Sequence, residues 1–144
     1  MKLSSLLLGG IFGVAVLAVL LVIAGVRFER PLTSQGAALY NPANEIVVKG
    51  VVEDVQEFSC PVGDWEVGTH LTLKTEDGVM RIHLAPSRIL RSQKIIFAPG
   101  DHLSVVGSKF RYRGSSDVIA RNLTRGSEDF IIRDREGKLL LVQQ

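Results

Sequence analysis

The sequence predicts an all-β domain that follows one N-terminal membrane helix. Leu6–Val26 is a run of 21 residues without a charge, about the length that crosses roughly 30 Å of hydrocarbon. Beyond residue 45 the chain consists of β-branched runs separated by turn residues, a pattern typical of a β-sheet. These last residues, about 100 in number, suffice for one core and for no second domain.

We interpret residues 1–27 as a membrane anchor that is retained. A cleaved secretory signal has an apolar core of about 7 to 15 residues, which is shorter than this segment, although cleavage and a buried soluble helix stay open as alternatives. Lys2 on one side and Arg27 and Arg30 on the other nearly balance, but a short tail before a large domain favours export of that domain. We therefore expect a single-pass protein of a bacterial inner membrane with its soluble domain in the periplasm.

Small residues recur at every fourth position of the anchor, at Ser5, Gly9 and Gly13. A small-x-x-x-small spacing lets two membrane helices approach closely. Gly9 and Gly13 therefore indicate a possible homodimer, with a monomeric anchor as the alternative.

Residues 28–44 are expected to form a linker, because Pro31, Gly36 and Pro42 interrupt any regular pattern. The folded domain is expected over residues 45–144. Within it, strands are predicted at 46–55, 70–75, 79–84, 102–110 and 118–124, a short helix at 86–94, and an appended C-terminal hairpin at 130–142.

Each element has its own local reason. Gly50 permits the first long strand to bend, and Asp77-Gly78 is a strong hairpin turn between the second and third strands. Pro86 suits an early helical position, and Asp134–Gly137 is rich in turn formers. Strand, strand, strand, helix, strand, strand is the order of the five-stranded OB-fold barrel.

Several segments carry a resemblance to a known type of protein. Gly50-Val51-Val52, Gly68–Thr75, Ile82–Pro86, Pro99–Gly107 and Ala120-Arg121 resemble segments of small bacterial membrane-anchored or periplasmic proteins with an OB-fold domain and no characterised function. The resemblance covers roughly residues 45–125. It implies the barrel and its turns, and it leaves the ligand open.

Charge is unevenly distributed along the domain. The formal net charge is +2, but residues 45–80 hold eight acids against two lysines, and residues 81–144 hold twelve Lys and Arg against six acids. This layout disfavours a uniformly basic nucleic-acid binder. Single-stranded nucleic acid stays an alternative only because Phe110–Arg113 interleaves aromatic rings with charges.

The expected activity is binding to a protein or to another envelope partner, without catalysis. Arginine can pair with anionic groups, and flat aromatic rings supply contact area. The candidate ligand-binding residues lie on the outward face of the second and third strands and near the loop between the fourth and fifth, and they are Trp65, Thr72, His83, Lys109, Arg111, Tyr112 and Arg113.

A metal site is the alternative function. With Asp77-Gly78 as a two-residue loop, Thr72 is opposite His83, and His70 is diagonal to His83 on the outward face. Cys60, in the preceding loop, could complete a set of ligands suited to zinc or copper. The competing interpretation is that both histidines are solvated and that Cys60, the single cysteine, is simply buried.

Catalytic and cofactor motifs are missing. The haem chaperones of cytochrome c maturation carry a His-x-x-x-Tyr motif, but no tyrosine occurs in Leu103–Val106 after His102. No phosphate-binding loop and no nucleophile motif is present either. The sequence therefore indicates a protein that is not an enzyme, and it identifies no cofactor.

Overall fold

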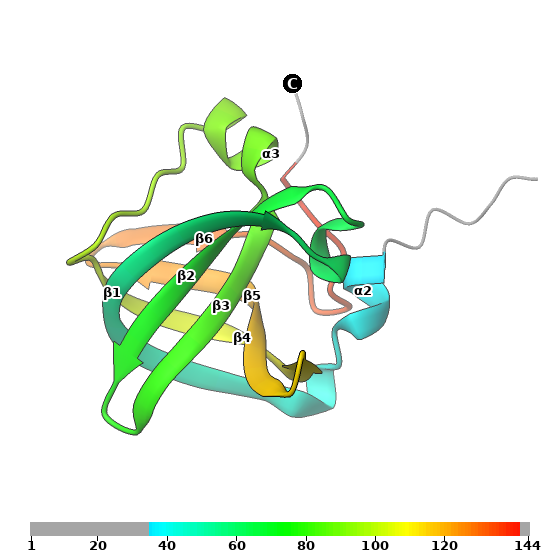
Figure 1. The fold of residues 1–144 in the computed structure, drawn as a ribbon. Helices are drawn as coiled ribbons and strands as arrows, with labels where there is room; N and C mark the ends of the chain where they lie inside the picture. Colours follow the sequence, from blue (N-terminus) through cyan, green and yellow to red (C-terminus); the bar gives the residue numbers. More distant parts are fainter. Residues whose placement is uncertain (1–34, 142–144) are drawn as a thin grey trace, which may run out of the picture. The chain divides into compact units, whose positions relative to one another are not determined.

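The β-branched runs form six strands of one sheet (Figure 1). The computed structural model describes residues 35–141, which lie within one unit of the chain, Thr33–Gln144. The strands are β1 (Glu45–Ser59), β2 (Val67–Thr75), β3 (Gly78–Pro86), β4 (His102–Tyr112), β5 (Ser115–Arg125) and β6 (Glu128–Ile131), and the helical segments are α2 (Gln35–Leu39), η1 (Pro42–Asn44), η2 (Pro61–Gly63) and α3 (Ser87–Ser92). The predicted all-β class, with a short helix between the third and fourth strands, is confirmed.

The strand pairings close into a cycle. The sheet order is β3-β2-β1-β4-β5-β6, and β3 also pairs with β5. Neighbours are antiparallel except β3 and β5, which run parallel where Ile82 meets Val118 and His83 meets Ile119. Following the pairs from β1 through β2, β3, β5 and β4 therefore leads back to β1. Of the six strands within residues 35–141, β6 alone lies outside this cycle.

Strand β1 is long and bent, and it pairs with two partners (Figure 1). Its first half pairs with β4 and its second half with β2. Gly50 lies where the two halves meet, and a Cβ there would lie 2.5 Å from the carbonyl oxygen of Lys74. Only glycine fits this close approach of two backbones, which agrees with the bend predicted at Gly50.

One face of the strands carries the main core. Alternation along β2 and β3 predicts that Leu71, Leu73, Met80, Ile82 and Leu84 share one inward face. Four of them are buried in the main core, and Met80 is half-buried against it. Burying such a side chain stabilises the fold by about 1.5–3 kcal/mol. The cluster also includes Val48, Val52, Ala85, Leu90, Phe97, Leu103, Val105, Val118, Ala120, Leu123 and Ile132.

The register of the β2–β3 hairpin differs from the prediction. Thr75 pairs with Gly78, so the loop is Glu76-Asp77 and not Asp77-Gly78. The positive φ of Gly78, +126°, falls just after the loop, where the Thr75 hydroxyl also donates to the Gly78 carbonyl at 2.8 Å. As a result Thr72 is opposite Arg81 and not opposite His83.

The predicted C-terminal hairpin is largely replaced by a sixth strand of the main sheet. Strand β6 pairs with β5 from Arg125–Glu128 to Asn122–Ile131, and between the two expected hairpin strands only a bridge from Arg133 to Leu139 forms. Phe130 packs on the main core with its ring centroid 5.2 Å from that of Phe97. Core packing of this phenylalanine outweighs the local hairpin pattern.

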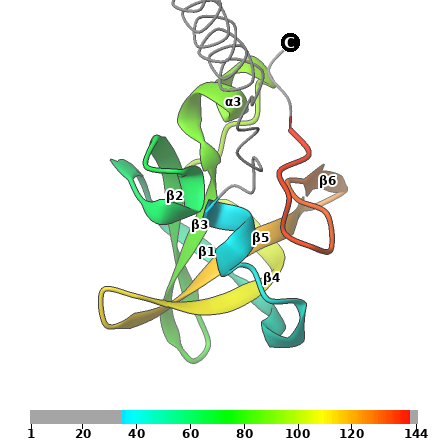
Figure 2. The same cartoon turned by 90° about the vertical axis from the view of Figure 1, so that its right-hand side faces the viewer.

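The end of the predicted linker packs on the domain. Tyr40, just after α2, is buried at 5% exposure and donates its hydroxyl hydrogen bond to Glu45. A Cβ on Gly137 would lie 2.2 Å from the Cβ of Tyr40, so α2 and the C-terminal segment lie side by side (Figure 2). The predicted anchor, with Gly9 and Gly13, lies outside the described residues. Within residues 35–141, no helix combines the length and apolarity that a membrane crossing requires.

Candidate metal centre

His70 on β2 and His83 on β3 are directly paired neighbours in the sheet. Their ring centroids are 4.5 Å apart and the rings are nearly perpendicular, at 88°. The prediction that they face solvent is wrong, because their exposed fractions are only 2% and 0%. They do lie on the face opposite the main core, but a second apolar cluster covers that face, formed by Tyr40, Phe58, Cys60, Val62, Phe110, Tyr112 and Ile119.

Cys60 is placed by the segment that joins β1 to β2. Pro61 begins η2, and the Cys60 carbonyl oxygen accepts the backbone N–H groups of Gly63 and Trp65 at 3.2 and 3.0 Å. This tight loop directs the Cys60 side chain inward, and the residue is only 1% exposed.

The Cys60 sulfur lies beside both imidazoles. Sγ is 3.3 Å from Nε2 of His70 and 3.5 Å from Nδ1 of His83. The three donor atoms all lie within 4.8 Å of one another. The structure thus brings together the three residues proposed from the sequence as metal ligands.

Asp117 on β5 holds His83 from the other side. Its Oδ2 lies 2.7 Å from Nε2 of His83, and its Oδ1 accepts the hydroxyl of Ser115 at 2.6 Å. Because a carboxylate accepts, Nε2 of His83 carries the proton and Nδ1 presents a lone pair toward Cys60. In protein metal sites, a ligating histidine commonly donates its other ring N–H to a carboxylate in this way, which fixes the orientation of the ring.

Aromatic rings enclose the histidines. Phe58 stacks on His70 with centroids 3.6 Å apart and an interplanar angle of 8°. Phe110 and Tyr112 meet the His83 ring at 5.0 and 5.3 Å, edge to face. These contacts restrict the orientation of both imidazoles and exclude water from them.

Burial controls the charge of the three candidate ligands. It lowers the pKa of His70 to about 3, helped by neighbouring His83, and it also lowers the pKa of His83. The pKa of the Cys60 thiol is raised, again chiefly by burial. At neutral pH both imidazoles are therefore uncharged, which is the protonation state that binds metals.

Arg133 introduces a positive charge into the same interior. It is 3% exposed and donates from Nη1 to the carbonyl oxygen of Ala120 at 2.7 Å. Burial lowers its pKa to about 10, while Tyr40 and Cys60 act in the opposite direction. The Ala120 that Arg133 contacts follows Ile119, a member of the second apolar cluster and the β5 residue paired with His83.

The space between the ligands is small. A cavity of about 10 Å³ is lined by Cys60, Val62, Gly63, Gly68, Thr69, His70, His83, Leu84 and Ala85. This volume is at the lower limit for one water molecule. A bare metal ion fits such a space, whereas an organic substrate does not.

Sequence reasoning missed Asp117 and Arg133. A single acid between Ser116 and Val118 at the start of a strand, and a single base after Ile131-Ile132, resemble ordinary solvated residues. The one feature of the sequence that could have indicated their burial is that both residues adjoin a strongly apolar stretch. Their burial depends on β3 meeting β5 and on the C-terminal segment packing beside Tyr40.

The predicted surface residues do not form one surface. Lys109, Arg111 and Arg113 are exposed on the β4–β5 hairpin, whereas Trp65, 57% exposed, belongs to the loop that holds Cys60. Thr72 is half-buried. His83 and Tyr112 were expected to contact a ligand at the surface, but both are buried in the second apolar cluster or against it.

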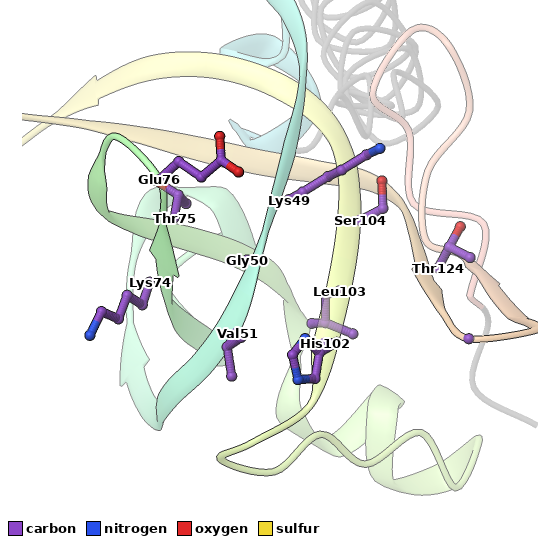
Figure 3. Close-up of a pocket in the computed structure, with 11 residues that line it drawn as sticks. Lys49, Gly50, Val51, Lys74, Thr75, Glu76, His102, Leu103, Ser104 and Thr124 are labelled. Carbon is purple, nitrogen blue, oxygen red and sulfur yellow. The ribbon is translucent and has the colours of Figure 1, made fainter.

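A larger hollow lies elsewhere, where β1, β2 and β4 meet (Figure 3). Its volume is about 560 Å³, and it is wide open to solvent. Lys49 and Lys74 point in opposite directions (Figure 3), so their charges do not converge on one ligand position. His102, the third histidine, lines this hollow and is remote in the chain from the residues around Cys60.

Comparisons with known proteins identify a family and include a weak structural likeness. A family model described as the MamS/MamX magnetosome protein family matches residues 45–130, a span that includes Cys60, His70, His83 and Asp117. No curated protein matches the chain. A chain of the S. pombe Stn1-Ten1 complex matches with a TM-score of 0.45 and 16% identity, covering 58% of this chain and 59% of that chain's length.

Proposed function

This chain belongs to the MamS/MamX magnetosome protein family, and from that premise we propose that it is a non-enzymatic, metal-binding module of a bacterial membrane. The single observation that carries the metal-binding function is the convergence of one thiol and two imidazoles in a buried position. Cysteine sulfur and histidine nitrogen are the donors that zinc and copper prefer.

The spacing of the donors suits one ion. Bonds of about 2.0–2.1 Å to nitrogen and about 2.3 Å to sulfur place sulfur and nitrogen donors about 3.6 Å apart around a four-coordinate metal and about 3.8 Å apart around a three-coordinate one. The separations of Sγ from the two ring nitrogens, 3.3 and 3.5 Å, require only small adjustments. The rings are also held by Asp117 and Phe58, so little conformational entropy is lost on binding.

Catalysis by the same residues is disfavoured because a substrate cannot reach the Cys60 thiol. A thiol, an imidazole and a carboxylate contact one another in the order that activates a cysteine nucleophile, namely Cys60, His83 and Asp117. Such a nucleophile must be a reachable thiolate. Cys60 is 1% exposed, its pKa is raised, and the adjoining cavity of about 10 Å³ has no room for a substrate.

The surrounding architecture in this proposal is an OB-fold barrel on a membrane anchor. The closed cycle of five strands, with α3 between β3 and β4, supports the OB assignment. The uncharged segment Leu6–Val26 supports a single-pass anchor of the inner membrane. We place the domain in the periplasm.

Metal analysis of the full chain in detergent tests the function. We expect about one equivalent of bound transition metal, and its loss in His70→Ala, His83→Ala and the milder Cys60→Ser. His102→Ala is the matched control, because His102 is exposed and lies outside the cluster. Circular dichroism distinguishes loss of the site from unfolding. A wild-type chain that binds neither zinc nor copper contradicts the proposal.

A second candidate function is contact with an acidic protein or another anionic envelope component. The β4–β5 hairpin supports it, because Lys109, Arg111 and Arg113 are exposed there and no acid occurs between residues 109 and 116. Cross-linking in cells followed by partner identification should lose its product in the Arg111→Ala, Arg113→Ala double variant. Lys74→Ala, exposed on β2, is the control. A product of unchanged yield removes this surface from consideration.

A further inference from the structure

The coordination shell at Cys60, His70 and His83 limits which ion it can hold. The cavity between them is otherwise lined by Val62, Gly63, Gly68, Leu84, Ala85 and Thr69, none of which supplies a cysteine, histidine or carboxylate ligand. The Thr69 hydroxyl is already engaged with Ser87 at 2.9 Å. Among the described residues, therefore, the shell offers three side-chain ligands, one sulfur and two nitrogens.

A fourth ligand from solvent has no place there. The cavity has a volume of about 10 Å³, which is the minimum that one water molecule needs. A metal ion in the same cavity therefore leaves no room for a water ligand. Phe58 covers one histidine, and Phe110 and Tyr112 cover the other. Zinc in proteins almost always has four ligands arranged as a tetrahedron. Trigonal sites of one cysteine and two histidines are copper sites, and thiolate ligands favour Cu(I).

The buried charges point in the same direction. One thiolate and two neutral imidazoles carry a charge of −1, so Cu(I) makes the unit neutral while Zn(II) leaves it at +1. Arg133, 3% exposed, already places a positive charge in this interior, because it is hydrogen-bonded to the carbonyl oxygen of Ala120, the residue after the Ile119 that pairs with His83. The carboxylate of Asp117 is partly offset by Arg81, whose Nη1 lies 3.7 Å from Oδ2. Burying a further positive charge is costly.

From these two observations we infer that the ion is Cu(I), held by Cys60 Sγ, His70 Nε2 and His83 Nδ1 in a three-coordinate, dry site. This inference rests on the metal-binding function proposed above. On binding, the S–H bond of Cys60 breaks, an S–Cu bond forms and one proton leaves to solvent, so no oxidation state changes. The apolar shell favours the lower-charged state of copper over Cu(II).

Anaerobic titration of the full chain in detergent tests the identity of the ion. Cu(I) is supplied from a chromophoric chelator of known affinity, and Zn(II) is then added in tenfold excess. We expect one equivalent of Cu(I) that zinc does not displace. X-ray absorption at the copper edge should show three ligands, one sulfur and two nitrogens. Cys60→Ser should lose this equivalent, and His102→Ala should keep it.

The outcomes separate the two proposals. If zinc displaces copper, or if the bound ion has four ligands, the Cu(I) inference fails while the metal-binding function stands. If neither ion binds, both fail. Arg133→Gln gives an independent measurement, because removing the buried charge should improve zinc binding relative to Cu(I) by roughly tenfold or more. If this variant does not fold, the coordination number of the wild-type site decides.

Discussion

The Nε2 atom of His83 lies 2.7 Å from Oδ2 of Asp117, although the two residues are 34 positions apart in the chain. The parallel pairing of β3 with β5 creates this contact, because it sets His83 beside Ile119. The carboxylate decides which imidazole nitrogen is protonated, and so it aims the lone pair of Nδ1 at Cys60. Asp117 is therefore a positioning residue for the proposed metal centre.

Replacing Asp117 by asparagine should weaken metal binding about 10- to 100-fold, because the tautomer of His83 is no longer set by a charge. Competition with a chelator of known affinity measures the effect. Asp77→Asn, in the exposed β2–β3 loop, is the matched control. Equal metal affinities for the wild type and for Asp117→Asn would show that Asp117 does not position His83 for metal binding.

Gly107→Ala should destabilise the domain. A Cβ at Gly107 would lie 2.3 Å from the carbonyl oxygen of Ile119 and 2.7 Å from a Val118 methyl, so β4 and β5 have to separate. We expect the free energy of unfolding to fall by about 1–3 kcal/mol or more. Urea denaturation followed by circular dichroism measures it. In Gly63→Ala the new Cβ would meet only Pro86, at 4.0 Å, and a similar loss there would show that the effect is not steric.

Leu71→Ala should lower the free energy of unfolding by about 2–5 kcal/mol. Leu71 is completely buried in the main core, so truncation leaves a cavity. Val79→Ala is the control, because Val79 is 64% exposed and its loss should change stability by about 0.5 kcal/mol or less. Similar midpoints in urea for the two variants would contradict the assignment of the core face.

The stability of the domain should depend on pH through Glu45. The Arg121 guanidinium, followed by the Tyr40 hydroxyl, lowers the pKa of Glu45 below its ordinary value of 4.5. A carboxyl with a depressed folded-state pKa stabilises above its unfolded pKa and loses this contribution as pH falls through the folded value. Wild-type stability should therefore decrease below pH 4.5 more steeply than that of Glu45→Gln. Thermal unfolding at several pH values tests this, and Glu53→Gln, an exposed glutamate on β1, should behave like the wild type.

A reporter fused after Gln144 should be active outside the cytoplasm. The prediction follows from the uncharged segment Leu6–Val26, which precedes the domain in the chain and is long enough to cross a membrane. Paired reporters that work only in the periplasm or only in the cytoplasm give opposite readouts for the two orientations. A cytoplasmic result contradicts the proposed location and makes a nucleic-acid ligand worth testing.

Local sequence patterns were sufficient for most of the secondary structure. Alternation predicted that Leu71, Leu73, Met80, Ile82 and Leu84 share one face. All of them contact the main core, although Met80 is only half-buried. A short helix does follow Pro86, although it spans Ser87–Ser92 and Pro86 itself is the N-cap residue that ends β3. These features depend on neighbours within a few residues, so a single sequence contains the information. The exact loop of the β2–β3 hairpin depended on the conformation of Gly78, which the pattern alone did not determine.

Some features of the candidate site could be predicted from the sequence, and others depend on the tertiary structure. By itself, the sequence predicted an all-β domain and offered Cys60, His70 and His83 as candidate ligands for an alternative, metal-binding function. Only the tertiary structure decided that they are buried together and that Asp117 and Arg133 join them. The physical reason is that alternation along a strand predicts which side chains lie on the same face. Whether that face is buried depends on other segments that pack against it and that are distant in the chain. Here the closing of β3 onto β5 and the packing of the Tyr40 and Cys60 segments turn an outer surface into an interior.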